Sequence, residues 1–109
     1  MIRLITTTSN NGLTNELVRI WESAVRQTHT FLSESEIERI KAYIPDAISR
    51  VERLLVFDNV ENNPIAFIGI EGRRIVMLFV DANHRGQGIG KQLVDYSIKH
   101  YDVNEVTVN

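Results

Sequence analysis

Apolar residues recur at helical spacing in three stretches of the chain. From Leu13 onward they return every three or four residues, which predicts an amphipathic helix over about 13–28. A second helix is expected after Ser33, because Ser33 and Glu36 form the pattern of a capping box. A third helix is expected over about 89–101. The apolar positions of the first helix are Leu17, Ile20, Trp21, Ala24 and Val25, and all of them, Trp21 included, are expected in the core.

Short apolar runs bounded by turn residues predict the strands. The expected strands cover residues 2–6, 54–57, 65–71, 73–80 and 104–108. The run 65–71 is long and apolar enough to be buried on both faces, and 73–80 is expected to lie centrally in the sheet. Short turns predict that 54–57, 65–71 and 73–80 form an antiparallel meander. Because a strand, a helix and a strand of this length form a right-handed crossover, 104–108 should lie parallel to 73–80.

The region between the second helix and the next strand leaves two interpretations open. Pro45 marks a break or kink in the second helix. Residues 46–52 can form a further turn of helix, or their last residues can begin the following strand. The predicted order is therefore β-α-α-β-β-β-α-β, a mixed sheet of the α+β (α/β) class in a single domain over residues 1–109.

Composition excludes several classes of protein. Apolar residues make up 43% and charged residues 24%, the balance of a soluble globular domain. A net charge of −2 argues against a nucleic-acid partner, which normally requires a clustered basic surface. The absence of cysteine removes disulfides, a thiolate nucleophile and a thiolate metal site, and no metal is expected. No apolar run approaches the ~20 residues of a membrane span, so we expect a cytoplasmic protein without a membrane partner.

Three glycines alternate immediately after the apolar strand 73–80. Gly86, Gly88 and Gly90 lack a Cβ atom, so the backbone can turn tightly and approach a ligand closely. The helix that follows directs its unpaired N–H groups and the positive end of its dipole to the same place. Arg85 and Lys91 add positive charge at the rim. This stretch is therefore expected to bind phosphate.

Two common glycine motifs do not fit this spacing. A dinucleotide fingerprint starting at Gly86 requires a glycine at position 91, which is Lys91. A P-loop ending at Gly90 and Lys91 requires glycine at position 85 and Ser or Thr at 92, but the chain has Arg85 and Gln92. An ordinary strand-to-helix turn needs only one glycine, so the alternating glycines favour a ligand-binding loop.

The segment Arg-Gly-Gln-Gly-Ile-Gly at 85–90 resembles the acetyl-coenzyme A loop of the GNAT superfamily of N-acetyltransferases, whose pattern is [Arg/Gln]-x-x-Gly-x-[Gly/Ala]. The predicted order of elements is that of the N-terminal part of the GNAT fold, so the resemblance covers essentially the whole chain. The segments 28–32 and 79–81 most resemble small bacterial acetyltransferases. Asp81 is expected to cap the loop.

The resemblance implies that acetyl-coenzyme A is the co-substrate. Its pantetheine arm would lie between the strand 73–80 and the parallel strand after the helix, against the backbone of Phe79 and Val80. N–H groups across Arg85 to Gly90 would bind the pyrophosphate. The coenzyme-binding residues carried over from the family pattern are Phe79, Val80, Arg85, Gly86, Gln87, Gly88, Ile89, Gly90, Lys91 and Asn109.

The implied reaction is direct acetyl transfer to an amine, on a small molecule or a peptide. Because a lysine-like amine is protonated at neutral pH, a base or a water chain is needed. Glu71, at a strand end, is the first candidate base, although an exposed carboxylate is the alternative interpretation. His29, in the segment after the first helix, is the second candidate, and a structural histidine is its alternative.

Complete GNAT domains continue with a further helix and two strands, whereas this chain ends at Asn109, so the domain is expected to be incomplete at its C-terminus. An uncovered strand edge and apolar face favour a homodimer or higher oligomer. Three hypotheses follow: an N-acetyltransferase or a truncated form of one, a non-catalytic coenzyme A-binding module, and a structural or interaction domain.

Overall fold

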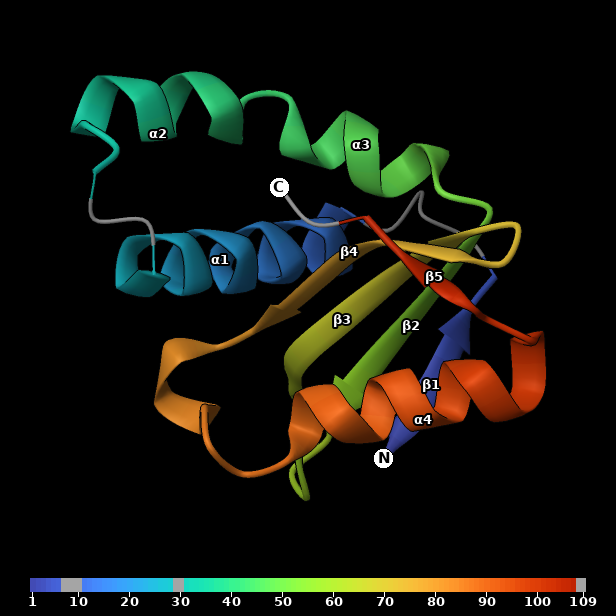
Figure 1. Ribbon diagram of the computed structural model, residues 1–109. Helices are drawn as coiled ribbons and strands as arrows, with labels where there is room; N and C mark the ends of the chain where they lie inside the picture. Colours follow the sequence, from blue (N-terminus) through green and yellow to red (C-terminus); the bar gives the residue numbers. More distant parts are fainter. Residues whose placement is uncertain (7–10, 29–30, 108–109) are drawn as a thin grey trace.

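A five-stranded mixed sheet organises the molecule in the order β1-β2-β3-β4-β5. The computed structural model describes residues 1–6, 11–28 and 31–107 (Figure 1). Neighbouring strands from β1 to β4 are antiparallel, and β5 is parallel to β4, which confirms the predicted meander and crossover. The elements are β1 (Ile2–Ile5), α1 (Asn11–Thr28), α2 (Glu34–Lys41), α3 (Ile44–Arg50), β2 (Arg53–Asp58), β3 (Pro64–Glu71), β4 (Arg74–Val80), a 3₁₀ turn η1 (Ala82–His84), α4 (Ile89–Tyr101) and β5 (Glu105–Val106).

The segment after α2 corrects the predicted order at one point. α3 is a separate helix, so the order is β-α-α-α-β-β-β-α-β rather than one with two helices before the second strand. Pro45 lies in the first turn of α3, where its missing N–H removes no helical hydrogen bond. The same residue could not continue α2. At the start of α2 the predicted capping box is confirmed: Glu36 N donates to Ser33 Oγ at 3.2 Å, and Ser33 N donates to Glu36 Oε1 at 3.0 Å.

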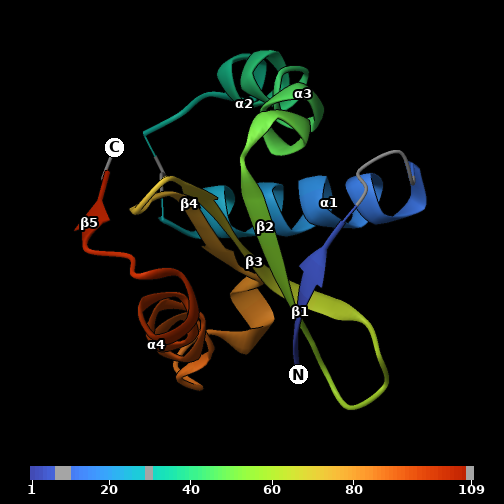
Figure 2. The same ribbon diagram turned by 90° about the vertical axis from the view of Figure 1, so that its right-hand side faces the viewer.

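Helices cover both faces of the sheet (Figures 1 and 2). On one face α1, α2 and α3 pack against β2 and β3, and α4 packs on the other. Alternate residues of β3 supply both layers: Phe67 lies in the α1 layer, and Ile68 lies in the α4 layer. All of β3 except Glu71 is buried, as predicted for a strand covered on both faces.

The strand β4 is less covered than predicted. It lies between β3 and β5, but β5 pairs with only two of its residues, Arg74 with Glu105 and Ile75 with Val106. From Val76 to Val80 the strand is half-buried or exposed. The sheet order confirms that this strand lies between two others, but its second half is less buried than expected, and among the described residues β5 pairs only with its beginning. None of the described helices is long and apolar enough to cross a membrane.

Candidate functional site

β5 pairs with the beginning of β4, and the described residues show no pairing along the second half of β4. Thr107 N donates to Ile75 O at 2.9 Å, and within residues 31–107 no backbone hydrogen bond joins the two segments beyond that point. Figure 2 shows β5 leading away from the rest of the sheet. Within residues 1–6, 11–28 and 31–107, the second half of β4 therefore has an edge without a paired strand, called the open edge below.

The backbone groups that face this edge follow from the pairing of β4 with β3. Asp81 N donates to Ile65 O at 2.9 Å, and Ala66 pairs with Val80. In an antiparallel pair, residues that bond the neighbouring strand alternate with residues whose N–H and C=O point the other way. Phe79 therefore directs its backbone groups to β3, whereas Leu78 and Val80 direct theirs to the open edge. The predicted backbone contact through Phe79 is corrected accordingly.

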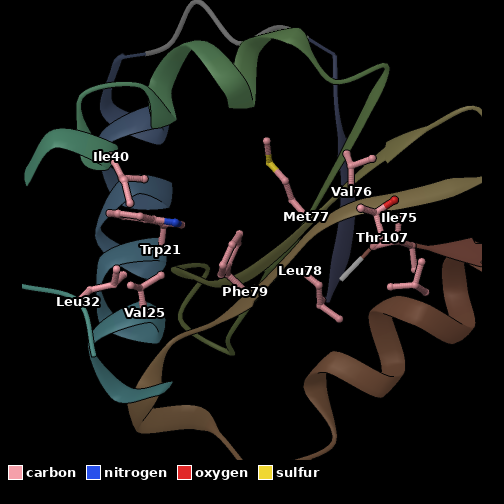
Figure 3. Close-up of a pocket in the computed structure, with 11 residues that line it drawn as sticks. Trp21, Val25, Leu32, Ile40, Ile75, Val76, Met77, Leu78, Phe79 and Thr107 are labelled. Carbon is pink, nitrogen blue, oxygen red and sulfur yellow. The ribbon is translucent and has the colours of Figure 1, made fainter. Parts of the chain in front are cut away.

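A groove of about 530 Å³ opens beside β4. Its walls come from α1, the segment around Leu32, α2, β4 and the end of β5 (Figure 3). The lining residues are Trp21, Val25, Leu32, Ile40, Ile75, Val76, Met77, Leu78, Phe79, Val106 and Thr107. The walls are almost entirely apolar. Trp21, predicted as a core residue, lies in the core and also lines this groove.

The glycine loop follows β4 and leads into α4. Gly86 and Gly88 have φ angles of +79° and +77°, which residues with a Cβ atom rarely adopt, and Gly88 is the N-cap of α4. The first hydrogen bond of the helix runs from Gln92 N to Gly88 O, at 3.0 Å. From Arg85 to Lys91, no backbone N–H group has an acceptor in the described part of the chain. The loop therefore offers consecutive free donors beside the positive end of a helix dipole.

Two cationic side chains flank this loop. Arg85 is exposed. The ammonium of Lys91 lies 2.7 Å from the Asp95 carboxylate, one turn further along α4. The hydrogen bond from Lys91 to Asp95 raises the pKa of the lysine. Lys91 is therefore fully protonated at neutral pH, but Asp95 balances part of its charge.

Asp81 holds the beginning of the loop. Its buried carboxylate caps η1 by accepting from Asn83 N at 3.4 Å, which confirms the predicted cap. It also accepts from Ser23 Oγ on α1 at 2.9 Å, and Ala82 N donates to the same Ser23 Oγ at 3.0 Å. Sequence analysis missed Ser23. Ser23 lies on the polar side of α1, with Arg19, Arg26 and Gln27 three or four positions away, so no sequence pattern marks it.

The charge of Asp81 is stabilised by several neighbours. Burial tends to raise the pKa of Asp81, but the hydrogen bonds from Ser23 and Asn83, with the charge of Arg19 and the proximity of His84, lower it overall. Arg19 Nη1 and His84 Nδ1 lie 3.9 Å and 3.4 Å from Asp81 Oδ2. The Asp81 carboxylate is therefore ionised in the folded protein at neutral pH.

The structure does not bring Glu71 to the groove. Glu71 is exposed at the β3–β4 hairpin, and its Oε1 accepts from Glu52 N at 3.2 Å. No acidic side chain is among the groove residues of the described chain, so the structure gives Glu71 no support as a base. His29 and Asn109 lie outside the described residues. Among residues 1–6, 11–28 and 31–107, no three His, Asp or Glu side chains are grouped as metal ligands.

Comparison with known proteins gives consistent results. Residues 9–109 match the model of the acetyltransferase (GNAT) domain. Two peptidyl-lysine N-acetyltransferases named YjaB are similar, from Salmonella typhimurium strain LT2 (32% identical over 83 residues) and Escherichia coli strain K12 (34% over 87). Both alignments cover 76% of this chain, and they cover 57% and 56% of those proteins, so the chain spans little more than half of their length.

Solved structures show the same fold. The solution structure of apo YjaB from Escherichia coli matches with a TM-score of 0.77 and 26% identity, over 94% of this chain and 67% of that one. An aminoglycoside 6'-N-acetyltransferase complexed with coenzyme A matches with a TM-score of 0.62 and 17% identity, over 94% of this chain and 55% of that one. At that identity the second likeness concerns the fold alone.

Proposed function

Because this chain belongs to the GNAT acetyltransferase family, we propose that it transfers an acetyl group from acetyl-coenzyme A to a primary amine. The family match extends over residues 9–109, and it confirms the resemblance read from the glycine loop. The observation that carries the proposal is the open edge of β4, which leads directly into a loop of free N–H donors. An extended ligand with a pyrophosphate group fits both parts at once.

The backbone supplies the proposed coenzyme contacts. The outward groups of Leu78 and Val80 are placed to bond the amides of a pantetheine arm, as an added strand would. The N–H groups from Arg85 to Lys91 would bind the pyrophosphate oxygens, with the Arg85 side chain adding charge. Gln87 and Ile89 take part through their backbone, and Phe79 takes part only through its ring. Asn109 is kept in this proposal as a contact to the arm.

Acetyl transfer requires a neutral amine. Its nitrogen attacks the thioester carbonyl carbon, the C–S bond breaks, and the coenzyme leaves as a thiolate that takes up a proton. An apolar groove helps, since desolvation lowers the pKa of an amine. The outward N–H of Leu78 or Val80 is our candidate donor to the oxyanion that forms.

We propose His29 as the residue that accepts the amine proton, directly or through water. It follows α1 in the sequence, and Val25 and Leu32, on either side of it in the chain, both line the groove. A His29→Gln variant should lower kcat and flatten the rise of kcat/KM with pH around the ordinary imidazole pKa of about 6.5. An unchanged pH profile would exclude His29 as the base and would indicate that solvent accepts the proton.

We propose the side chain of a peptide lysine as the acceptor. The two YjaB relatives are named for that acceptor, and its four-carbon stem suits an apolar groove. Small-molecule amines are the second candidate, since a neighbouring structure with the same fold is an aminoglycoside acetyltransferase.

Two measurements test the function in sequence. Isothermal titration with acetyl-coenzyme A should show saturable binding to one site per chain. If no binding were found, the hypothesis of a structural or interaction domain would be favoured. Thiol release with lysine peptides and small amines should then exceed the rate without protein. Binding without release would indicate a non-catalytic coenzyme A-binding module.

We also propose that the chain forms a homodimer or higher oligomer. β5 is the last strand of the described sheet, and its Val106 is 57% exposed. Ile98 on α4 is 50% exposed. Apolar side chains beside an unpaired strand edge favour association. Light scattering that gives the mass of one chain at high concentration would contradict this.

A further inference from the structure

The indole N–H of Trp21 has no hydrogen-bond acceptor among residues 1–6, 11–28 and 31–107. Trp21 is only 4% exposed, and its ring belongs to the core between α1 and the sheet. No group in the described part of the chain accepts from its Nε1, and that atom is not sealed away from solvent. Figure 3 shows the indole nitrogen directed away from α1 toward the open space of the groove.

An unpaired donor in such a place indicates a ligand. Tryptophan N–H groups in largely buried side chains normally find a partner, and one that reaches a groove can bond a ligand that replaces water there. Trp21 is more than nine-tenths buried and faces the groove that the proposed acceptor would enter. Its natural partner is an oxygen of the bound substrate, since an indole N–H can donate but not accept.

Four charged side chains of α1 and α2, the helices that supply Trp21 and Ile40, are paired with one another. On the α1–α2 side, Glu22 bonds Arg26 at 2.8 Å and Lys41 at 2.7 Å, and Arg26 also pairs with Glu34. Glu22 and Glu34 therefore have cationic partners and cannot easily attract a polycation. The remaining surface consists of aliphatic and aromatic side chains, with Val25, Leu32, Ile40 and Phe79 around Trp21. The groove thus suits the uncharged part of a substrate that carries an acceptor for one hydrogen bond.

We propose that the Trp21 indole N–H donates a hydrogen bond to a carbonyl oxygen of the acceptor substrate, which makes Trp21 a specificity-determining residue. This inference rests on the proposed acetyl transfer and narrows its acceptor to an aliphatic amine that carries an amide, such as a lysine residue within a peptide. The aliphatic stem contacts the apolar walls, and the amide oxygen meets the indole. Simple alkylamines, which have no carbonyl group, cannot make this bond.

The pantetheine arm of the coenzyme also carries amide carbonyls, so the experiment must separate the two sources. Two acceptors share the same amine and stem: Nα-acetyl-lysine N-methylamide, with carbonyls, and n-pentylamine, without them. Trp21→Phe removes the donor and keeps an aromatic ring. Ile40→Val is the control, because it alters the same groove without changing a donor.

The expected result is a loss confined to one substrate. In Trp21→Phe, kcat/KM for the lysine amide should fall about 5-fold to 10-fold, the size of one lost hydrogen bond, while the value for n-pentylamine changes less than 2-fold. Ile40→Val should affect both substrates equally. The affinity of Trp21→Phe for acetyl-coenzyme A, measured by titration calorimetry, should stay unchanged. Equal losses on both substrates, or weaker coenzyme binding with an unchanged substrate ratio, would overturn the inference.

The wild-type protein gives a readout that needs neither turnover nor a folded variant. Trp21 is the one tryptophan of the chain, so its fluorescence reports directly on this part of the groove. The lysine amide should change the emission and saturate at a several-fold lower concentration than n-pentylamine. Equal affinities would contradict the role of Trp21. A preference for the amide without thiol release from either amine would contradict the proposed catalysis and leave the inference on Trp21 standing.

Discussion

The hydroxyl of Ser23 in α1 donates a hydrogen bond of 2.9 Å to the carboxylate of Asp81, 58 positions later in the chain. Ser23 Oγ also accepts from Ala82 N at 3.0 Å. One side chain of α1 therefore holds the start of the glycine loop. The same helix supplies Trp21 and Val25 to the groove. The proposed coenzyme loop and acceptor groove are thus fixed relative to each other through α1.

Ser23→Ala should destabilise the protein by about 1–3 kcal/mol, because it removes a donor to a buried carboxylate and an acceptor from Ala82 N. It should also weaken acetyl-coenzyme A binding several-fold by loosening the loop. Urea denaturation and titration calorimetry measure the two effects. Ser49→Ala is a matched control, since the Ser49 hydroxyl bonds Asp46 O at 2.7 Å at an exposed position of α3. Equal stability of the two variants would argue against an anchoring role for Ser23.

The free energy of unfolding should decrease at low pH because Asp81 becomes protonated there. Because folding lowers the pKa of Asp81, its ionised form adds stability above the ordinary aspartate pKa of about 3.9, and this is lost as the pH falls through the lower folded value. Asp81→Asn should therefore be less stable than the wild type at pH 7, with the difference shrinking between about pH 5 and pH 3. Urea titrations across this range measure it. Glu22, Glu34 and Glu36, whose pKa values are also lowered, are present in both proteins and cancel. A difference that stays constant with pH would refute the assignment.

Gly88→Ala should separate backbone strain from ligand binding. A Cβ atom on Gly88 meets nothing within 4 Å, so its only structural cost is the positive φ, about 1–2 kcal/mol. In the proposed complex the same Cβ blocks the approach of the pyrophosphate, and acetyl-coenzyme A affinity should fall at least 10-fold.

Gly72→Ala is the control for this variant. Gly72 has a φ of +59° and equally empty surroundings, but it lies in the β3–β4 hairpin at the opposite end of β4. Thermal melting should show a similar loss of stability for both variants, and calorimetry should show weakened binding only for Gly88→Ala. If Gly88→Ala and Gly72→Ala bound acetyl-coenzyme A with equal affinity, the glycine loop would not be part of the coenzyme site.

Proline substitutions test the direction of the β4 backbone. Val80→Pro removes an N–H that faces the open edge, so the ladder with β3 stays intact, whereas Phe79→Pro removes one that faces β3. Circular dichroism and urea denaturation should show Phe79→Pro as the more destabilised by about 1 kcal/mol or more. Val80→Pro should fold and bind acetyl-coenzyme A poorly. If folded Val80→Pro bound the coenzyme as tightly as the wild type, the proposed backbone contact would be misplaced.

The sequence predicted the fold better than the details of the site. The glycine loop was recognisable because Gly86 and Gly88 need conformations that few residues adopt. The direction of the Phe79 backbone groups could not be predicted from the sequence. It depends on the register between β4 and β3, which shifts between Gly69 and Ile70. Periodicity also placed Trp21 on the core face of α1 correctly, but that face extends into the groove, and no sequence pattern separates the two environments.

The position of Glu71 away from the groove has a similar cause. Glu71 ends the strand beside β4, but it lies at the β3–β4 hairpin, whereas the glycine loop follows the other end of β4. The Ser23–Asp81 hydrogen bond joins positions 58 apart, so only the folded chain reveals it. Local patterns predict elements, whereas contacts between distant elements depend on how those elements pack.

The outward-facing peptide groups of Leu78 and Val80 affect how substrate specificity can evolve in such a protein. In the proposed complex the coenzyme is recognised by main-chain atoms, which every residue other than proline supplies alike. Substitutions along this part of β4 can then reshape the acceptor groove without altering the coenzyme contacts. Coenzyme binding would thus stay constant while substitutions along the same strand change which amine the groove accepts.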